Sequence, residues 1–194
     1  MTRLIFVRHG YSEGNLLGEF HGHMDGDLTE LGHKQAECAG LYLRNRKIDV
    51  AYSSDLRRAY KTALHITKYH DIEPIKDESL REIYAGEWEG KKFSELERDY
   101  PELYRTWRTN PSEFVSIGGE SMRELYDRIK AEVERIADSL AVTQVKHRAF
   151  NTRSVAVWYE SIAYLGVSIR IEFCGVIKDS TAKSVKVEIC VISE

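Results

Sequence analysis

An apolar run near the N-terminus stops at two side chains that together can carry out phosphoryl chemistry. In the stretch IFVRHGYSEGN, residues 5–15, Arg8 and His9 directly follow the last apolar residue, Val7. A guanidinium offers a rigid fork of N–H donors that suits phosphate oxygens, and a neutral imidazole beside it can attack phosphorus. Asn15 adds a neutral donor. The pattern indicates a phosphate site, although a surface arginine beside an idle histidine would look the same in isolation.

A second pair of cations stands at the start of a predicted helix. Arg57 and Arg58 lie in SSDLRRAYKT, just after another apolar run. Free N–H groups and the helix dipole already attract anions to a helix N-terminus, so a cation there is misplaced unless an anion neutralises it. Successive helical residues point about 100° apart, so the two arginines cannot share one role. The alternative is two solvated arginines.

Three carboxyl groups lie among apolar residues in LREIYAGEWEG, residues 80–90. They belong to Glu82, Glu87 and Glu89. A carboxyl group that is partly buried has its pKa raised by desolvation, which suits a general acid near neutral pH. The alternative for each is an ordinary surface glutamate.

Other candidate side chains carry a weaker signal. His21 and His23 have the spacing of a metal-binding pair, but the sequence offers no third ligand. No GK[ST] follows the glycines of residues 10–14, so a nucleotide P-loop is not supported. Four aromatic residues could line a substrate pocket or simply pack together: Tyr84, Trp88, Tyr104 and Trp107.

The elements that must position these groups alternate in the first half of the chain. Short apolar runs predict buried strands, and apolar residues at helical spacing predict helices. The predicted strands are Leu4–Val7 and 48–54; the predicted helices are 30–45, with Thr29 as its N-cap, and 56–70, capped by Ser54 or Asp55. This order predicts an α/β fold in which ligands bind at the carboxyl ends of parallel strands.

The second half is less regular. Residues 93–107 look helical around a break at Pro101, within a small subdomain at about 91–118. The clearest helix of the chain carries an apolar stripe from Met122 to Ile136. Past Leu140 we expect a short strand at 142–145, a helix within 154–166, and strands within 167–177 and 184–192.

Composition limits the class of protein. The 28 Lys and Arg residues against 31 Asp and Glu give a net charge of −3, which argues against nucleic-acid or membrane partners. The three cysteines are widely spaced and suggest neither disulfides nor zinc. The sequence shows neither a signal-peptide pattern nor a long apolar segment. We expect one domain over residues 1–194, located in the cytoplasm as a monomer or homodimer.

Five motifs together resemble the histidine phosphatase (phosphoglycerate mutase-like) superfamily. They are RHGYSEGN, DLTELGHKQA, SSDLRRAYKTA, LREIYAGEWEG and GGES, and they span about the first 138 residues. The resemblance implies a three-layer α/β/α sandwich with a mostly parallel sheet and a small helical lid at about 91–118. It also implies phosphohistidine chemistry without metal or cofactor.

The resemblance assigns roles to individual residues. His9 is expected to take the phosphoryl group, with Arg8 and Arg58 holding its oxygens. Glu82 is expected to protonate the leaving oxygen and then to act as a base for water. Asn15, Ser12 and Gly22 are expected to bind the phosphate or substrate.

The chain departs from the family pattern in its last third, where the usual SHG is missing. His147 is the candidate for the family's second histidine by its position in the chain, but Lys146 and Arg148 stand where the family has Ser and Gly. A glycine matters there because backbone that closely approaches an oxyanion often needs unusual dihedral angles. Three explanations stay open: His147 binds phosphate in altered surroundings, the site is impaired, or the reading frame changes after about residue 138. Otherwise His147 is an exposed histidine in a basic loop.

These observations favour a phosphatase acting on small phosphorylated metabolites. The stretch YRTWRTNPSEFVSIGGES, residues 104–121, resembles the short phosphatase branch, including broad-specificity bacterial phosphatases and the α-ribazole phosphatase group. Two alternatives stay open: a phosphoglycerate mutase dependent on 2,3-bisphosphoglycerate, and a catalytically impaired phosphate-binding member.

Overall fold

A mostly parallel sheet lies at the centre of the fold. The computed structural model describes residues 2–146, 153–158, 177–178 and 184–190. In this part of the chain the strand order is β3-β2-β4-β1-β6-β5, and only β5 runs antiparallel to its neighbour. The strands are β1 (Thr2–Val7), β2 (Val50–Ser53), β3 (Ile75–Lys76), β4 (Arg153–Trp158), β5 (Ile177–Lys178) and β6 (Ser184–Cys190). The predicted mixed α/β class is confirmed.

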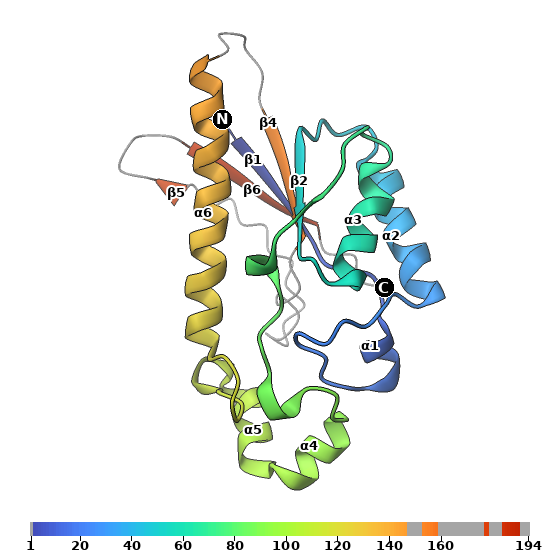
Figure 1. Ribbon diagram of the computed structural model, residues 1–194, viewed down its shortest axis with the longest axis vertical. Coiled ribbons are helices and arrows are strands. Elements are labelled where there is room, and N and C mark those ends of the chain that lie inside the picture. The colour runs from blue at the N-terminus through green and yellow to red at the C-terminus, as the bar shows by residue number, and fades with distance from the viewer. Residues whose placement is uncertain (1, 147–152, 159–176, 179–183, 191–194) are drawn as a thin grey trace.

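Helices flank the strands on two sides. They are α1 (Glu13–Leu17), α2 (Glu30–Leu43), α3 (Arg57–Thr67), α4 (Phe93–Asp99), α5 (Pro101–Thr109) and α6 (Met122–Lys146), with short 3₁₀ turns η1 (Glu78–Leu80), η2 (Gly86–Trp88) and η3 (Pro111–Glu113). In Figure 1, α2 and α3 lie side by side on one side of the strands, and the long α6 lies on the other. Helices α4 and α5 gather at one end, beside the start of α6.

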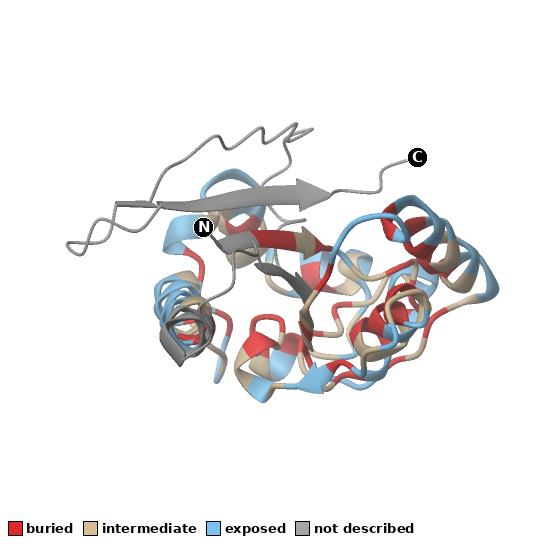
Figure 2. Ribbon diagram, turned by 90° about the horizontal axis from the view of Figure 1, so that it is seen from above, coloured by how far each residue is buried: buried red, intermediate tan, exposed pale blue. Residues whose placement is uncertain are grey.

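Alternate residues of β1 face two different cores. Ile5 and Val7 pack against residues of α2 and α3, including Ala39 and Ile66. Leu4 belongs to a second core with Leu80 and with Ile136 of α6. Successive side chains of a strand point to opposite faces, so β1 is buried on both sides, as its uninterrupted apolar run predicts. Figure 2 shows buried residues along β1 between the flanking helices.

The helix starts show what local sequence can and cannot specify. Thr29 is the N-cap of α2, and its Oγ1 accepts a hydrogen bond from Gly32 N at 3.1 Å, as predicted. The expected caps of α3 are wrong: its N-cap is Leu56, which makes no side-chain cap. Instead Asp25 Oδ1, from a distant loop, accepts the hydrogen bond of Arg57 N at 2.6 Å. A carboxylate from elsewhere in the fold therefore supplies the anion at this N-terminus.

Residues 91–118 pack through an aromatic core. Helices α4 and α5 are separated at Tyr100, so the predicted break at Pro101 is confirmed. Trp88 is fully buried, with its ring centroid 4.8 Å from Phe114 and 6.2 Å from Trp107. The buried residues of this core are Phe20, Ile83, Ala85, Trp88, Leu96, Trp107, Phe114 and Leu125, with Tyr104 packed against them. Of the four aromatic candidates for a pocket, three therefore pack, and only Tyr84 is exposed.

Two expectations for the last third are wrong. Residues 142–145 continue α6 instead of forming a strand, because no Gly or Pro interrupts the helix and each added residue gains a hydrogen bond. Residues 153–158 form β4 instead of a helix, paired between β1 and β2. The strand expected within 184–192 is confirmed over β6. His147 lies outside the described residues, as do 159–176.

Candidate active site

The end of β1 is held tightly against α2 and α3. Gly10 N donates a hydrogen bond to Thr62 Oγ1 of α3 at 3.1 Å. On the other side the chain crosses the start of α2 so closely that a Cβ on Gly10 would lie 2.3 Å from the carbonyl oxygen of Gly32. Only glycine allows this approach. The position of His9, one residue earlier, is therefore fixed by contacts on both helices.

His9 is held as a neutral imidazole with its Nε2 lone pair available. Its Nδ1 lies 2.6 Å from the carbonyl oxygen of Gly10. A carbonyl only accepts, so Nδ1 carries the proton and Nε2 does not. Burial, followed by the positive charges of Arg58 and Arg8, lowers the pKa of His9 from 6.5 to about 3. The imidazole is therefore unprotonated at neutral pH and suited to nucleophilic attack.

The two arginines at the start of α3 have separate environments. Arg58 is buried and donates from Nη1 to Met24 O and from Nη2 to Gly22 O, both at 2.7 Å. Arg57 is exposed and pairs with Asp25, Nε to Oδ2 at 3.0 Å. Arg58 thus brings a desolvated positive charge close to His9, whereas Arg57 forms an ordinary surface ion pair. Of the two arginines, the buried one is Arg58, for which the sequence predicts a phosphate-binding role.

The other expected phosphate contacts differ in kind. Arg8 is exposed at the end of β1. Asn15 and Ser12 form a capping box on α1, in which Asn15 Oδ1 accepts hydrogen bonds from Ser12 N at 3.0 Å and Ser12 Oγ at 2.9 Å. The atom of the Asn15 side chain that can donate a hydrogen bond to a phosphate is therefore the amide nitrogen, Nδ2. Buried Ser12 holds Asn15 in place.

Gly22 occupies a position that no other residue fits easily. Its φ is +49°, and an added Cβ would lie 2.5 Å from Glu89 Oε1 and 2.8 Å from the carbonyl oxygen of Ile83. Its own carbonyl accepts the hydrogen bond from Arg58. The loop that contains Gly22 therefore lies between Arg58 and the segment next to Glu82.

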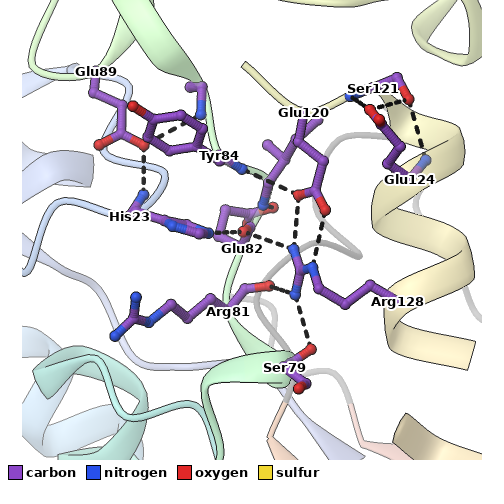
Figure 3. A network of polar contacts seen from close by, with 12 residues as sticks. His23, Ser79, Arg81, Glu82, Tyr84, Glu89, Glu120, Ser121, Glu124 and Arg128 are labelled. Atoms are coloured by element: carbon purple, nitrogen blue, oxygen red, sulfur yellow. Dashed lines mark hydrogen bonds and ion pairs between the residues drawn. The ribbon is translucent and has the colours of Figure 1, made fainter. Parts of the chain in front are cut away.

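Glu82 is buried and tied to its own backbone. One carboxylate oxygen, Oε1, accepts a hydrogen bond from Ile83 N at 2.9 Å. Its carbonyl oxygen lies 2.9 Å from His23 Nε2 and 3.3 Å from Arg128 Nη2 (Figure 3). The preceding Arg81 pairs with both carboxylate oxygens of Asp55, Nε to Oδ1 at 2.7 Å. The segment that carries Glu82 is thus fixed on several sides.

The two histidines of the H-x-H pattern have different partners. His21 Nε2 lies 3.3 Å from Glu19 Oε2, whereas His23 Nε2 donates to the carbonyl of Glu82. Burial lowers the pKa of His23, which keeps it a neutral donor. Within the described residues, no group of three or more His, Cys, Asp or Glu has the geometry to hold a metal ion.

Sequence reasoning missed His23 and Arg128 as neighbours of Glu82. For Arg128 a signal existed: it follows Leu125 by three residues and precedes Ile129, so it lies next to the buried stripe of α6. A charged residue beside an apolar stripe needs a partner. For His23 the only signal is its metal-like spacing from His21.

An open pocket begins at His23. It has a volume of about 460 Å³ and is lined by His23, Tyr84, Gly119, Glu120 and Glu124. Pockets of this size accommodate small organic molecules. The exposed ring of Tyr84 lies tilted at 48° to the ring of His23, with 5.2 Å between ring centroids. The pocket is therefore a candidate site for the group that the phosphate esterifies.

Comparison with known proteins gives one consistent family. The sequence profile of the histidine phosphatase superfamily (branch 1) matches residues 4–163. Phosphoserine phosphatase 1 of Hydrogenobacter thermophilus is 40% identical over 136 residues, which are 70% of this chain and 64% of that protein. Glucosyl-3-phosphoglycerate phosphatase of Mycobacterium tuberculosis is 33% identical over 137 residues, 71% of this chain and 61% of that protein. The matches thus span less than two thirds of these relatives.

Solved structures agree in fold. The mycobacterial glucosyl-3-phosphoglycerate phosphatase in complex with VO3 superposes with a TM-score of 0.71 at 29% identity, covering 80% of this chain and 74% of that one. Bacillus stearothermophilus YhfR gives 0.73 at 28% identity, covering 82% and 74%. Within the described residues, no helix combines the length and apolar character needed to cross a bilayer.

Proposed function

Because the chain belongs to the histidine phosphatase superfamily (branch 1), we propose that it hydrolyses small phosphomonoesters through a phosphohistidine on His9. One observation carries the proposal: a neutral imidazole with an available Nε2 lies close to the buried charge of Arg58. A neutral nitrogen nucleophile beside fixed cationic donors is what phosphoryl transfer requires.

In the first step Nε2 of His9 attacks phosphorus while the bond to the ester oxygen breaks. Arg58 and Arg8 hold the phosphoryl oxygens, and Asn15 Nδ2 adds a neutral donor. Glu82 gives its proton to the leaving oxygen, so the alcohol departs uncharged. Stabilisation of the transferring group by the arginines is expected to be the largest contribution to the rate.

In the second step water attacks the phosphohistidine. Glu82, now ionised, takes a proton from the water, the phosphorus–nitrogen bond breaks, and inorganic phosphate leaves. This returns His9 to its neutral form and Glu82 to its protonated form. The cycle needs neither a metal nor an organic cofactor.

The relatives' names support a small phosphorylated metabolite as substrate, since one is a phosphoserine phosphatase and another a glucosyl-3-phosphoglycerate phosphatase. We place the alcohol part of the substrate in the pocket at His23 and Tyr84. The complete fold is proposed to be a three-layer sandwich in which residues 91–118 act as a lid over this pocket. The protein is proposed to work in the cytoplasm.

A phosphate-binding role for His147 is proposed from the sequence alone. Its place in the chain suggests the second histidine of the family, and an imidazole there would add a donor to the phosphate. Without it the site would still hold His9, Arg58 and Glu82, so a weakened phosphatase or a phosphate-binding protein would result.

The test is hydrolysis of p-nitrophenyl phosphate by the purified chain in the presence of EDTA. We expect turnover by the wild type and none by His9→Ala. Acid-labile, base-stable phosphate on the wild-type protein after quenching would support the phosphohistidine. Equal inactivity of both proteins would contradict the enzyme proposal, and interconversion of phosphoglycerates stimulated by 2,3-bisphosphoglycerate would show a mutase instead.

A further inference from the structure

Arg128 of α6 uses its entire hydrogen-bonding capacity around the segment that carries Glu82. Its Nη1 donates to Ser79 O at 2.8 Å and to Arg81 O at 3.1 Å. Its Nη2 donates to Glu82 O at 3.3 Å and to Glu120 Oε2 at 2.7 Å, and its Nε donates to Glu120 Oε1 at 2.9 Å. A guanidinium has five N–H donors, and all five are engaged here.

We propose that Arg128 is the positioning residue for Glu82 and that it fixes the direction of the Glu82 carboxyl group during proton transfer. The proposal rests on the proton-donor role given to Glu82 above. Because no donor of Arg128 is left over for a substrate, its role is exerted through the backbone of the segment. Figure 3 shows the guanidinium between this segment and Glu120.

The link from Arg128 to the carboxyl group passes through one peptide unit. Arg128 binds the carbonyl oxygen of Glu82, and the N–H of the same peptide bond, on Ile83, donates to Glu82 Oε1 at 2.9 Å. The peptide unit is planar, so its carbonyl and N–H turn together. A rotation of this unit would therefore carry the carboxyl group with it.

Glu120 holds the same segment on its other side. Its backbone N donates to Tyr84 O at 2.7 Å, and its Oε2 accepts from Tyr84 N at 3.3 Å. Arg128 therefore binds backbone carbonyls up to and including that of Glu82, and Glu120 binds the backbone of Tyr84, two residues after Glu82. The side chains of Arg128 and Glu120 are 25% and 14% exposed, so water competes weakly with this ion pair.

The contacts need an arginine specifically. The carbonyl of Ser79 belongs to the turn η1, and the carbonyls of Arg81 and Glu82 follow that turn. The Nη1 and Nη2 atoms of Arg128 donate to these carbonyls, and Nη2 and Nε donate to the two carboxylate oxygens of Glu120. A lysine has one nitrogen with three donors and cannot meet all five acceptors.

Two substrates separate positioning from general stability. A nitrophenolate leaves without a proton, whereas an alkoxide needs one from Glu82. We therefore compare kcat/KM for p-nitrophenyl phosphate and for phosphoserine, because kcat/KM reports the steps up to departure of the alcohol. The variant is Arg128→Met. The control is Arg135→Met, which removes another arginine of α6 that binds Glu132 and Asp77 without touching these carbonyls.

We expect Arg128→Met to lose at least ~10-fold in kcat/KM on phosphoserine and less than ~3-fold on p-nitrophenyl phosphate, since general acid catalysis contributes roughly 100-fold or more. Arg135→Met should change kcat/KM only slightly, and by the same factor for both substrates. Equal losses on both substrates for Arg128→Met, or no loss, would overturn the proposal.

If Arg128→Met does not fold, Arg128→Lys is judged by the same ratio of losses. Glu82→Gln is measured alongside and should show the same preference for loss on phosphoserine. A wild type inactive on both substrates would contradict the proposed function itself. A wild type active on both, with Glu82→Gln selective and Arg128 variants unselective, would overturn only the role of Arg128.

Discussion

The Nδ1 of His9 lies 2.6 Å from the carbonyl oxygen of Gly10, the next residue in the chain. This contact fixes the imidazole tautomer without help from a distant carboxylate, because the carbonyl can only accept. The same Gly10 is anchored to Thr62 and packed against Gly32. The groups that set the position of His9 therefore also set its protonation.

The low pKa of His9 predicts a specific pH dependence of stability. The native pKa, about 3, lies below the ordinary 6.5, so below pH 6.5 the unfolded chain binds a proton that the native state does not. The free energy of unfolding should therefore fall on acidification, by up to about 1.4 kcal/mol per pH unit from this group. Between pH 7 and pH 5, wild type should lose about 2 kcal/mol more than His9→Gln. Denaturant unfolding at several pH values measures this.

His23 and His70 also have lowered pKa values because they are buried, and both remain in the His9→Gln variant. Only the difference between the two curves therefore reports on His9. Curves that stay parallel from pH 7 to pH 5 would show that His9 is not held neutral.

Arg58 and Arg57 should respond very differently to the same substitution. Arg58→Met removes the guanidinium hydrogen bonds to the carbonyls of Gly22 and Met24 and removes the buried charge near His9. We expect kcat/KM for p-nitrophenyl phosphate to fall roughly 100-fold or more, as for loss of one donor to a transition-state oxyanion. Arg57→Met removes surface ion pairs with Asp25 and Asp27 and a hydrogen bond to the Asp25 carbonyl, so its stability should change by no more than about 1 kcal/mol.

Steady-state kinetics and denaturant unfolding on both variants test the assignment. Similar kinetic losses in Arg57→Met and Arg58→Met would contradict the assignment of Arg58 to catalysis and of Arg57 to surface ion pairs.

The aromatic core predicts that Trp88 matters for stability. Its ring is fully buried against Phe114 and Trp107. Trp88→Ala should lower the free energy of unfolding by about 3–5 kcal/mol through lost burial and a cavity. Tyr126→Ala is the matched control, because Tyr126 is 60% exposed and its loss should cost about 0.5 kcal/mol or less. Equal costs for the two variants would mean that Trp88 lines a solvated pocket.

Local features of the sequence predicted those elements that depend on local physics. Thr29 caps α2 because an N-cap needs only its own helix, and Pro101 separates α4 from α5 because proline restricts the residue before it. Ile5 and Leu4 fall in different cores because strand side chains alternate. These outcomes required no knowledge of distant partners.

Contacts between distant segments could not be predicted in this way. The anion at the start of α3 comes from Asp25, more than thirty residues earlier, and nothing near Arg57 signals it. Arg128 donates a hydrogen bond to the carbonyl of Glu82, which lies 46 residues earlier in the sequence. The sequence predicts a helix where β4 forms, because the identity of this strand depends on its pairing with β1 and β2. Tertiary contacts decide such cases over local propensity.

Gly22 and Gly18 offer a final comparison of backbone strain with steric clash. Both have positive φ, +49° and +66°, so alanine at either position costs about 1–2 kcal/mol in strain. A Cβ on Gly18 would meet no atom within 4 Å, whereas a Cβ on Gly22 would lie 2.8 Å from the carbonyl oxygen of Ile83. That oxygen belongs to the backbone and cannot move alone. Gly22→Ala should therefore displace the segment that carries Glu82, in addition to its cost in backbone strain.

We expect Gly18→Ala to be less stable but to retain its kcat/KM. Gly22→Ala should lose more stability and at least ~10-fold in kcat/KM, because small misplacements of catalytic groups are costly. The loss should be larger on phosphoserine than on p-nitrophenyl phosphate, since the displaced group donates the proton. Matching kinetics for the two alanine variants would show that the close contact between Gly22 and Ile83 does not help to position Glu82.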